Sequence, residues 1–168
     1  PLHEFVPHAT KGQQEMADTM GVSLQYIQQR VESLCEHNPM LGHRGCRLGN
    51  TYPEKTQMQT RAILGAALEL KKEGVETHPE IMVPLTGILY EFKEQEKVIR
   101  EEAAKLFEEV GDSIAFKVGT MIEIPRAALT ADRIASSAEF FSFGTNDLTQ
   151  MTFGYSRDDI AYLLTVYL

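Results

Sequence analysis

The stretch KVGTMIEIPRAALTAD, residues 117–132, decides the fold class of this chain. Its first half belongs to an apolar run that ends at a proline, so residues 114–124 are expected to form a buried strand. Its second half begins a helical pattern over residues 126–137, which Thr130 is expected to divide into two pieces. A strand followed directly by a helix is the repeating unit of parallel α/β proteins.

The same alternation continues on both sides of this stretch. Residues 81–85 and 139–144 predict two more buried strands. Further helices are expected at residues 11–20, 23–37, 51–74, 89–110 and 158–168. In the helix at residues 51–74 the expected buried face is Met58, Ala62, Ala66 and Leu70. The pattern is typical of an α/β fold, either an open doubly wound sheet or a (β/α) barrel.

The glycine-rich residues 40–49 predict a short strand, or a loop whose backbone approaches another segment closely.

A complete (β/α)8 barrel takes about 250 residues. This chain has 168 residues, so a barrel would be partial. Residues 1–37 are expected to form a helical lead-in segment and residues 38–168 the partial barrel. The first residues include no methionine and no secretory signal, which favours an excised piece of a longer chain.

Composition excludes several classes of function. The net charge is −8, from 16 Lys and Arg against 24 Asp and Glu, which argues against general nucleic-acid binding. No apolar run is long enough to span a membrane. Cys35 and Cys46 have no zinc or redox spacing. Free thiols in a reducing compartment are the expectation, with a disulfide as the alternative that no spacing supports, so an intracellular, cytoplasmic location is the default. Neither a Gly-x-Gly-x-x-Gly nor a phosphate-loop motif is present, which disfavours nucleotide binding in this segment.

Two acidic residues follow expected strands, and functional groups of parallel α/β folds gather at such strand ends. Glu123 interrupts an apolar run, and Asp147 follows the next strand along the chain. Burying a carboxylate is costly unless it is paired, protonated or bound to a metal. The pair therefore suits a hard cation such as Mg²⁺. In the alternative interpretation Glu123 pairs with Arg126, and Asp147 caps the following helix.

Two further segments could bind an anion. Gly144, Thr145, Asn146 and Asp147 offer backbone N–H groups and side-chain donors at a strand-to-helix turn, although the same residue types form ordinary turns. Arg44 lies between glycines, and its planar guanidinium suits a carboxylate or phosphate. An ordinary surface arginine is the alternative for Arg44.

Three long segments resemble one family of enzymes. They are NPMLGHRGCRLG (residues 38–49), residues 117–132 and FFSFGTNDLTQMTFG (residues 140–154), and PLHEFVPH (residues 1–8) extends the match. The chain resembles the pyruvate, phosphate dikinase family of phosphoenolpyruvate-utilising enzymes, in the C-terminal barrel that binds phosphoenolpyruvate or pyruvate. Sister enzymes with the same barrel are phosphoenolpyruvate synthase and the sugar-phosphotransferase Enzyme I, but the run GHRGCRL favours the dikinase.

The resemblance implies a (β/α)8 barrel of which this chain holds the third to sixth units. It implies a Mg²⁺ ion held by Glu123 and Asp147, and a substrate lined by Glu123 and residues 144–147. It also implies that Arg44 contacts phosphoryl or carboxylate oxygens as a catalytic residue. The family interconverts ATP, phosphate and pyruvate with AMP, diphosphate and phosphoenolpyruvate, through a phosphohistidine domain of the same parent chain.

The resemblance also indicates what lies elsewhere. Two family arginines are expected before Pro1, and the cysteine that acts as the acid is expected after Leu168. Neither Cys35 nor Cys46 fits the place of that cysteine. The chain alone is therefore expected to be inactive, and a truncated binding piece without catalysis is the alternative function. The parent is expected to be a homodimer, in the cytosol, a plastid or a glycosome.

Overall fold

The computed structural model describes residues 1–157 and 159–167. The chain divides into two compact units, Pro1–Arg44 and Gly45–Leu168. The last expected helix was placed at residues 158–168. Its described part is α9 (Ile160–Tyr167), and Asp158 and Leu168 lie outside the described residues.

The first unit is helical. Its elements are η1 (Leu2–Phe5), α1 (Thr10–Met20), α2 (Leu24–Leu34) and η2 (Pro39–Leu41). Ser23 caps α2 by accepting a hydrogen bond from the backbone N–H of Tyr26 at 3.2 Å. The chain leaves α1 through Gly21, whose φ of 66° needs a residue without a side chain. Both helices expected in this region form, although α2 ends at Leu34, before the expected end at residue 37.

The second unit alternates helices and strands. Its remaining elements are α3 (Gly45–Thr51), α4 (Pro53–Lys72), β1 (Glu80–Val83), α5 (Leu89–Val110), β2 (Lys117–Ile122), α6 (Pro125–Leu129), α7 (Ala131–Ile134), β3 (Phe141–Phe143) and α8 (Thr145–Phe153). All three expected strands form, and the helix after β2 is divided at Thr130 as predicted. The strand considered for residues 40–49 is wrong, because those residues form η2 and α3.

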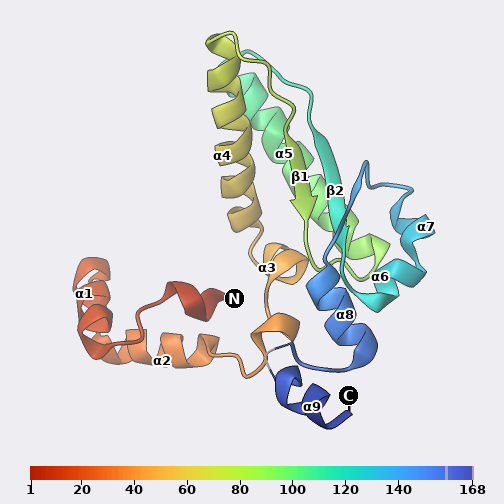
Figure 1. Cartoon of the computed structure of the whole chain (residues 1–168). Helices are drawn as coiled ribbons and strands as arrows, with labels where there is room; N and C mark the ends of the chain where they lie inside the picture. Colours follow the sequence, from red (N-terminus) through yellow and green to blue (C-terminus); the bar gives the residue numbers. More distant parts are fainter. Residues whose placement is uncertain (158, 168) are drawn as a thin grey trace. The chain divides into compact units, whose positions relative to one another are not determined.

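The strands make a small parallel sheet in the order β1-β2-β3 (Figure 1). Val83 is in register with Thr120, and Ile122 is in register with Phe143. The chain is therefore a mixed α/β structure, and consecutive strands are neighbours in the sheet. Because parallel strands end at the same edge, the residues that follow β1, β2 and β3 come together there.

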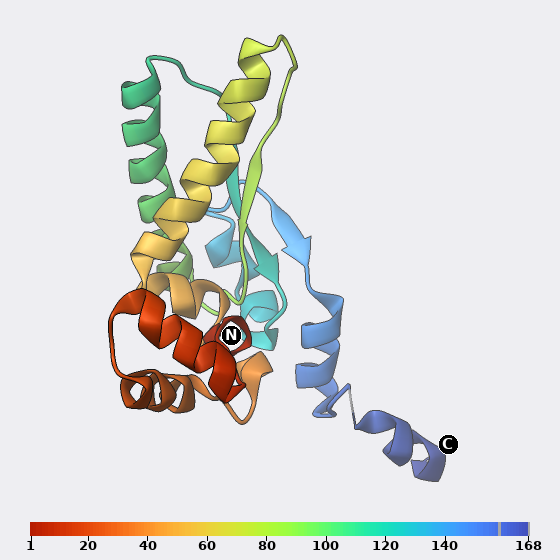
Figure 2. The ribbon, with the colours of Figure 1, turned by 90° about the vertical axis from the view of Figure 1, so that its left-hand side faces the viewer.

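Helices α4 and α5 lie side by side along the strands in both ribbon views (Figures 1 and 2). Leu64 and Leu68 of α4 pack against Ala103 and Leu106 of α5. Arg61 of α4 adds an ion pair to the buried Glu102 and a second one, at 2.6 Å, to the exposed Glu109. A second cluster joins α5 to the sheet, through residues Cys46, Val83, Leu85, Phe92, Ile99 and Val118.

The expected buried face of α4 is wrong. Met58 and Leu70 are 59% and 41% exposed, and Ala62 and Ala66 are also exposed. The buried positions are instead Thr60, Leu64, Ala67 and Leu68. Both sets have helical spacing, so periodicity alone could not choose between them. The choice is made by α5, which covers the stripe that contains Leu64 and Leu68.

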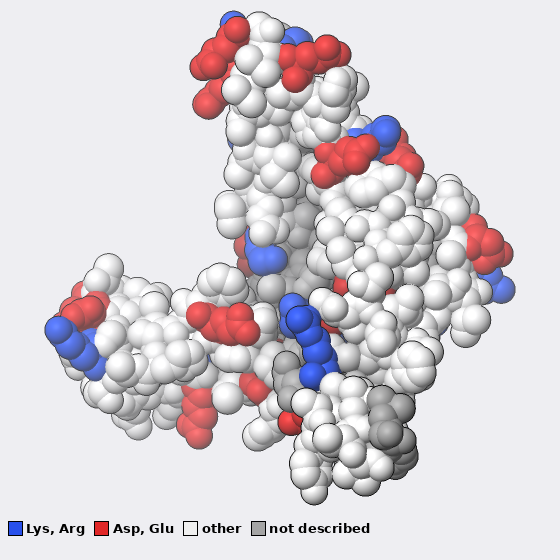
Figure 3. Space-filling model, in the orientation of Figure 1, with Lys and Arg blue, Asp and Glu red and all other residues white. Residues whose placement is uncertain are grey.

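Charged side chains of both signs gather at the end of the second unit where α4 ends, at the top of Figure 3. Lys71 at the end of α4 pairs with Asp112, which follows α5, at 2.6 Å. This pair fastens the two helix ends on the surface. Among the described helices, none combines the length and the apolar character needed to cross a membrane.

Alanine substitution at two glycines of the second unit is expected to change the free energy of unfolding in opposite directions. A Cβ on Gly119 of β2 would clash with the carbonyl oxygen and ring of Phe140, whereas one on Gly65 of α4 would meet nothing within 4 Å. We expect Gly119→Ala to lower the free energy of unfolding by about 1–3 kcal/mol through overpacking. We expect Gly65→Ala to raise it by about 0.5–1 kcal/mol. Urea denaturation of both variants measures this, and equal midpoints would contradict the close packing of β2 on residue 140.

Candidate functional site

Three strand ends form the candidate site. Pro84 and Leu85 follow β1, Glu123 follows β2, and Gly144 follows β3. The backbone N–H of Gly144 donates to the carbonyl of Ile122 at 3.1 Å, which brings the ends of β2 and β3 together. The sequence-based prediction that Glu123 and Asp147 follow neighbouring strands is consistent with this sheet order.

Glu123 is almost completely buried, with 3% of its surface exposed. Its Oε1 accepts a hydrogen bond from the backbone N–H of Leu85 at 2.6 Å. Leu85 has a φ of 59°, and it alone among the described residues other than glycine has a positive φ. That backbone conformation costs about 1–2 kcal/mol. The strained turn after β1 therefore supplies a partner for the buried carboxylate.

The side chain of Glu123 leaves no space for a side chain at position 144. A Cβ on Gly144 would lie 2.5 Å from Cβ and Oε2 of Glu123 and 2.8 Å from Sδ of Met121. The φ of Gly144 is −85°, which other residues adopt readily, so the turn itself does not require glycine. The close approach of the two strand ends does, and it places the carboxylate of Glu123 directly beside the start of α8.

Helix α8 begins with the predicted substrate residues. Thr145 and Asn146 are exposed, and Asp147 is half-buried in the first turn. Asp147 does not cap α8, as the alternative interpretation expected, because the N-cap residue is Gly144 and no side chain caps the helix. Within residues 1–157 and 159–167 the carboxylate of Asp147 makes no hydrogen bond or ion pair. The positive end of the helix dipole favours a negative charge at this position.

The start of α3 fastens the turn after β1. The backbone N–H of Cys46 donates to the carbonyl of Pro84 at 2.9 Å, and its Sγ–H donates to the carbonyl of Leu85 at 3.2 Å. From the sheet, the hydroxyl of Thr120 donates to the carbonyl of Val83 at 2.7 Å. Burial raises the pKa of the Cys46 thiol to about 12, so the thiol is protonated at neutral pH and can donate.

Sequence reasoning did not find this support of the site. Leu85 and Thr120 carry no pattern that separates them from core residues. The glycines of residues 42–49 were the one signal, because they predicted a close backbone approach. That approach is present, since a Cβ on Gly45 would lie 2.8 Å from the carbonyl oxygen of Pro84. The expected free thiols are also confirmed, with Cys46 buried and Cys35 exposed.

Arg44 is the last residue of the first unit, whereas Glu123, Gly144 and Asp147 belong to the second. The structure therefore describes Arg44 separately from the strand-end acids. Its side chain is half-buried, and its backbone N–H donates to the carbonyl of Gly42 at 3.2 Å. Its role as an oxygen clamp stays a prediction.

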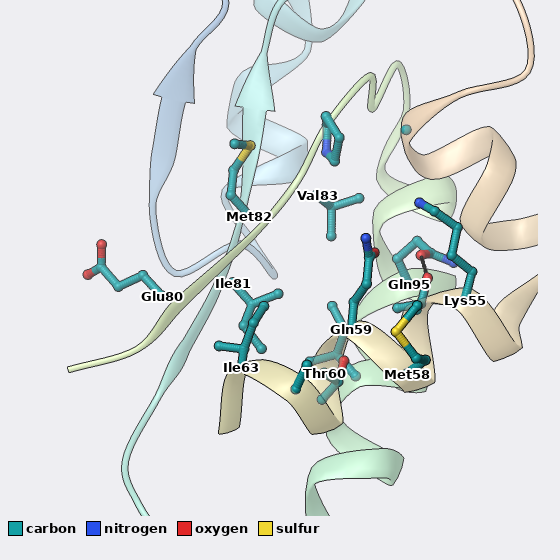
Figure 4. Close-up of a pocket in the computed structure, with 15 residues that line it drawn as sticks. Lys55, Met58, Gln59, Thr60, Ile63, Glu80, Ile81, Met82, Val83 and Gln95 are labelled. Carbon is teal, nitrogen blue, oxygen red and sulfur yellow. Dashed lines mark hydrogen bonds between the residues drawn. The ribbon is translucent and has the colours of Figure 1, made fainter. Parts of the chain in front are cut away.

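The described residues of the second unit border a groove and a smaller hollow. A groove of about 630 Å³ runs between α4 and β1 and is lined by aliphatic side chains with Lys55, Gln59 and Gln95 (Figure 4). It contains none of the predicted site residues. A hollow of about 510 Å³ lies between α8 and α9 and is lined by Thr145 and Asn146, together with Arg157. Two of the predicted substrate residues therefore border a cavity.

The donor set at the strand ends suits a hard cation only in part. Among the described residues no group of three His, Cys, Asp or Glu side chains could enclose a metal ion. Mg²⁺ is commonly bound through one or two carboxylates, with waters and substrate oxygens as its other ligands. Glu123 and Asp147 fit that pattern, and they do not fit a site built entirely from protein ligands.

Comparison with known proteins agrees with this combination of a parallel sheet and strand-end acids. Residues 7–167 match the family model described as the PEP-binding domain of PEP-utilising enzymes. The chain belongs to this family. It is 56% identical over 168 residues to pyruvate, phosphate dikinase of Clostridium symbiosum, covering 99% of this chain and 19% of that protein.

Plant relatives give the same result. The chain is 58% identical to the chloroplastic pyruvate, phosphate dikinase 1 of Arabidopsis thaliana, and the match covers all of this chain and 18% of that protein. It is 55% identical to pyruvate, phosphate dikinase 2 of Zea mays, with 19% of that protein covered. The chain thus spans about a fifth of the length of these relatives, which are named as dikinases. The resemblance stated from the sequence is confirmed.

The contact between Gly144 and Glu123 can be tested by adding one methyl group. We expect Gly144→Ala to lower the free energy of unfolding by about 1–3 kcal/mol, because the new Cβ overlaps the buried carboxylate. Gly87→Ala is the control, since its Cβ would make only an ordinary contact with Glu91 at 3.4 Å. Urea denaturation compares the two. A Gly144→Ala variant as stable as Gly87→Ala would refute the close approach.

Proposed function

We propose that this chain supplies the phosphoenolpyruvate- and pyruvate-binding face of a pyruvate, phosphate dikinase. The parent enzyme would interconvert ATP, phosphate and pyruvate with AMP, diphosphate and phosphoenolpyruvate. One observation carries the proposal: a buried acid, Glu123, lies at a strand end beside the glycine that begins the helix carrying Asp147. The family membership and the names of the relatives support it.

We also propose that the chain is part of a (β/α)8 barrel and spans its third to sixth units, of which β1, β2 and β3 would be the last three strands. Residues 1–37 would be a helical lead-in, and residues 38–168 the barrel part. The parallel order β1-β2-β3 supports a barrel, because consecutive strands of a barrel are neighbours. The groove along β1 gives further support, since a preceding strand and its helix would cover Ile63 and Met82, which line it.

In this proposal Glu123 and Asp147 hold Mg²⁺ together with the substrate. When bound, the ion would stabilise negative charge that develops on a substrate oxygen. The part played by the chain itself is orientation. The Leu85 N–H directs one carboxylate oxygen of Glu123, and Gly144 leaves room for the other. Burial of Glu123 excludes water from that side of the carboxylate.

The substrate carboxylate would lie at the start of α8. The first backbone N–H groups of a helix have no partner inside the helix, and they favour an anion. Thr145 adds a hydroxyl donor and Asn146 an amide donor, and both are exposed for contact.

Arg44 would clamp phosphoryl or carboxylate oxygens with two parallel N–H groups. The phosphoryl group would arrive on a phosphohistidine domain of the parent, a homodimer in this proposal, so this chain alone would not turn over substrate.

The acids can be tested on the chain itself. We expect Glu123→Gln and Asp147→Asn each to weaken Mn²⁺ binding at least about tenfold, equivalent to about 1.4 kcal/mol, because each removes a charge and keeps the shape. Electron paramagnetic resonance titration with Mn²⁺, with and without pyruvate, measures the affinity. Glu101→Gln on the exposed face of α5 is the control and should bind as the wild type does. Unchanged binding in either variant would remove that acid from the site.

The proposed two-oxygen contact of the Arg44 guanidinium can be tested by substitution with alanine and with lysine. We expect Arg44→Ala in a full-length dikinase carrying this segment to raise the KM for pyruvate or lower kcat, with kcat/KM down about tenfold or more. A lost hydrogen bond to a charged group costs about 1.5–3 kcal/mol. Arg44→Lys should not restore it, because an ammonium cannot grip two oxygens in parallel. Arg30→Ala, on the exposed surface of α2, is the control. Recovery to within about twofold in the lysine variant would exclude the clamp.

A further inference from the structure

The peptide bond between Pro84 and Leu85 is held from both of its sides. Its carbonyl oxygen, on Pro84, accepts the N–H of Cys46 at 2.9 Å. Its N–H, on Leu85, donates to Oε1 of Glu123 at 2.6 Å. Because a peptide group is planar, the carbonyl and the N–H point in opposite directions and turn together. A bond that fixes the carbonyl therefore also fixes the direction of the N–H.

This orientation is not the one that Leu85 would adopt by itself. A positive φ is uncommon for a bulky residue such as leucine, and a flip of the peptide plane would return Leu85 to a negative φ. The same flip would turn the N–H away from Glu123 and leave a buried carboxylate oxygen without this donor. A strained conformation persists only where surrounding contacts impose it.

The contacts that impose it come from Gly45 and Cys46. Gly45 has a φ of 56°, and a Cβ at this position would lie 2.8 Å from the carbonyl oxygen of Pro84 and 2.9 Å from Cβ of Leu85. Cys46 is fully buried and adds a second bond, from Sγ–H to the carbonyl of Leu85 at 3.2 Å. The backbone N–H and the thiol of Cys46 thus donate to the carbonyls of Pro84 and Leu85, which are successive residues of the strained turn.

We propose that Gly45 and Cys46 are positioning residues that hold the Pro84–Leu85 peptide in its flipped orientation and thereby aim the Leu85 N–H at Glu123. The inference rests on the proposed function for its consequence, metal affinity, but not for the geometry itself. It explains why a buried thiol and a left-handed glycine occur together at the start of α3. Ordinary packing would need neither the second donor nor the positive φ of Leu85.

The first experiment measures hydrogen exchange of the Leu85 amide by NMR, in the whole chain without metal. Cys46→Ala keeps the backbone N–H bond to Pro84 and removes the Sγ–H bond to the carbonyl of Leu85, which holds the other side of the strained residue. We expect it to speed exchange at Leu85 about tenfold or more, and Cys46→Ser, which keeps a side-chain donor, to restore exchange to within about twofold. Gly45→Ala is a second route to the same change, because its Cβ would press on the carbonyl of Pro84. Leu68→Ala is the control: it removes packing between α4 and α5 and should leave Leu85 no more affected than other amides.

The second experiment titrates the same variants with Mn²⁺. We expect Cys46→Ala to weaken binding at least about threefold and Cys46→Ser to recover it, while Leu68→Ala binds as the wild type does. Exchange at Leu85 within twofold of wild type in both Cys46→Ala and Gly45→Ala would overturn the positioning role. If one of these variants does not fold, the other decides. Failure of the wild type to bind Mn²⁺ would overturn the metal assignment, while the exchange result would still decide the positioning role.

Discussion

The hydrogen bond between the Leu85 N–H and the Glu123 carboxylate is the constraint on which the strand-end region depends. A buried carboxylate without partners would cost several kcal/mol, so the chain must bring a donor to it. The donor lies on a turn with a φ of 59°, which is itself unfavourable. The glycines around the site follow from this requirement. Gly144 gives the carboxylate space, and Gly45 lets α3 approach the turn. The site therefore takes its shape from one charged group that the fold keeps out of water.

Much of the fold could be predicted because strands and helices have different periods. The three strands, the division at Thr130 and the extent of α5 all followed from apolar spacing and from proline or glycine at the ends. The buried face of α4 did not follow, because Met58 and Leu64 both belong to apolar stripes of helical spacing. Which stripe is buried depends on where α5 packs, and this tertiary contact cannot be seen from the local sequence. The strand considered for residues 40–49 failed for a related reason: closely spaced glycines indicate a close approach, but not the secondary structure that makes it.

The candidate site was predictable to the extent that its chemistry conflicts with its surroundings. Glu123 stands out in the sequence because an acid interrupts an apolar run. Leu85 and Cys46 do not stand out, because both are apolar or weakly polar residues in places where a core residue would also fit. Their contribution comes from backbone direction and from donors to carbonyl oxygens, which no side-chain pattern records. The positions that support a site through main-chain groups are thus the hardest to find from one sequence.

The open side of the sheet shows how the two parts of the proposal depend on each other. Among the described residues β1 pairs only with β2, and the groove between β1 and α4 is lined by Met58, Ile63 and Met82. An uncovered strand edge with an apolar groove is unfavourable in water and is normally covered by further chain or by another molecule. The carboxylate of Glu123, in contrast, is already positioned within the second unit by the N–H of Leu85, whose peptide is held in turn by Cys46 of α3. If the barrel proposal holds, further barrel units would cover the groove and add stability, whereas the geometry around Glu123 is already built by the residues of this chain.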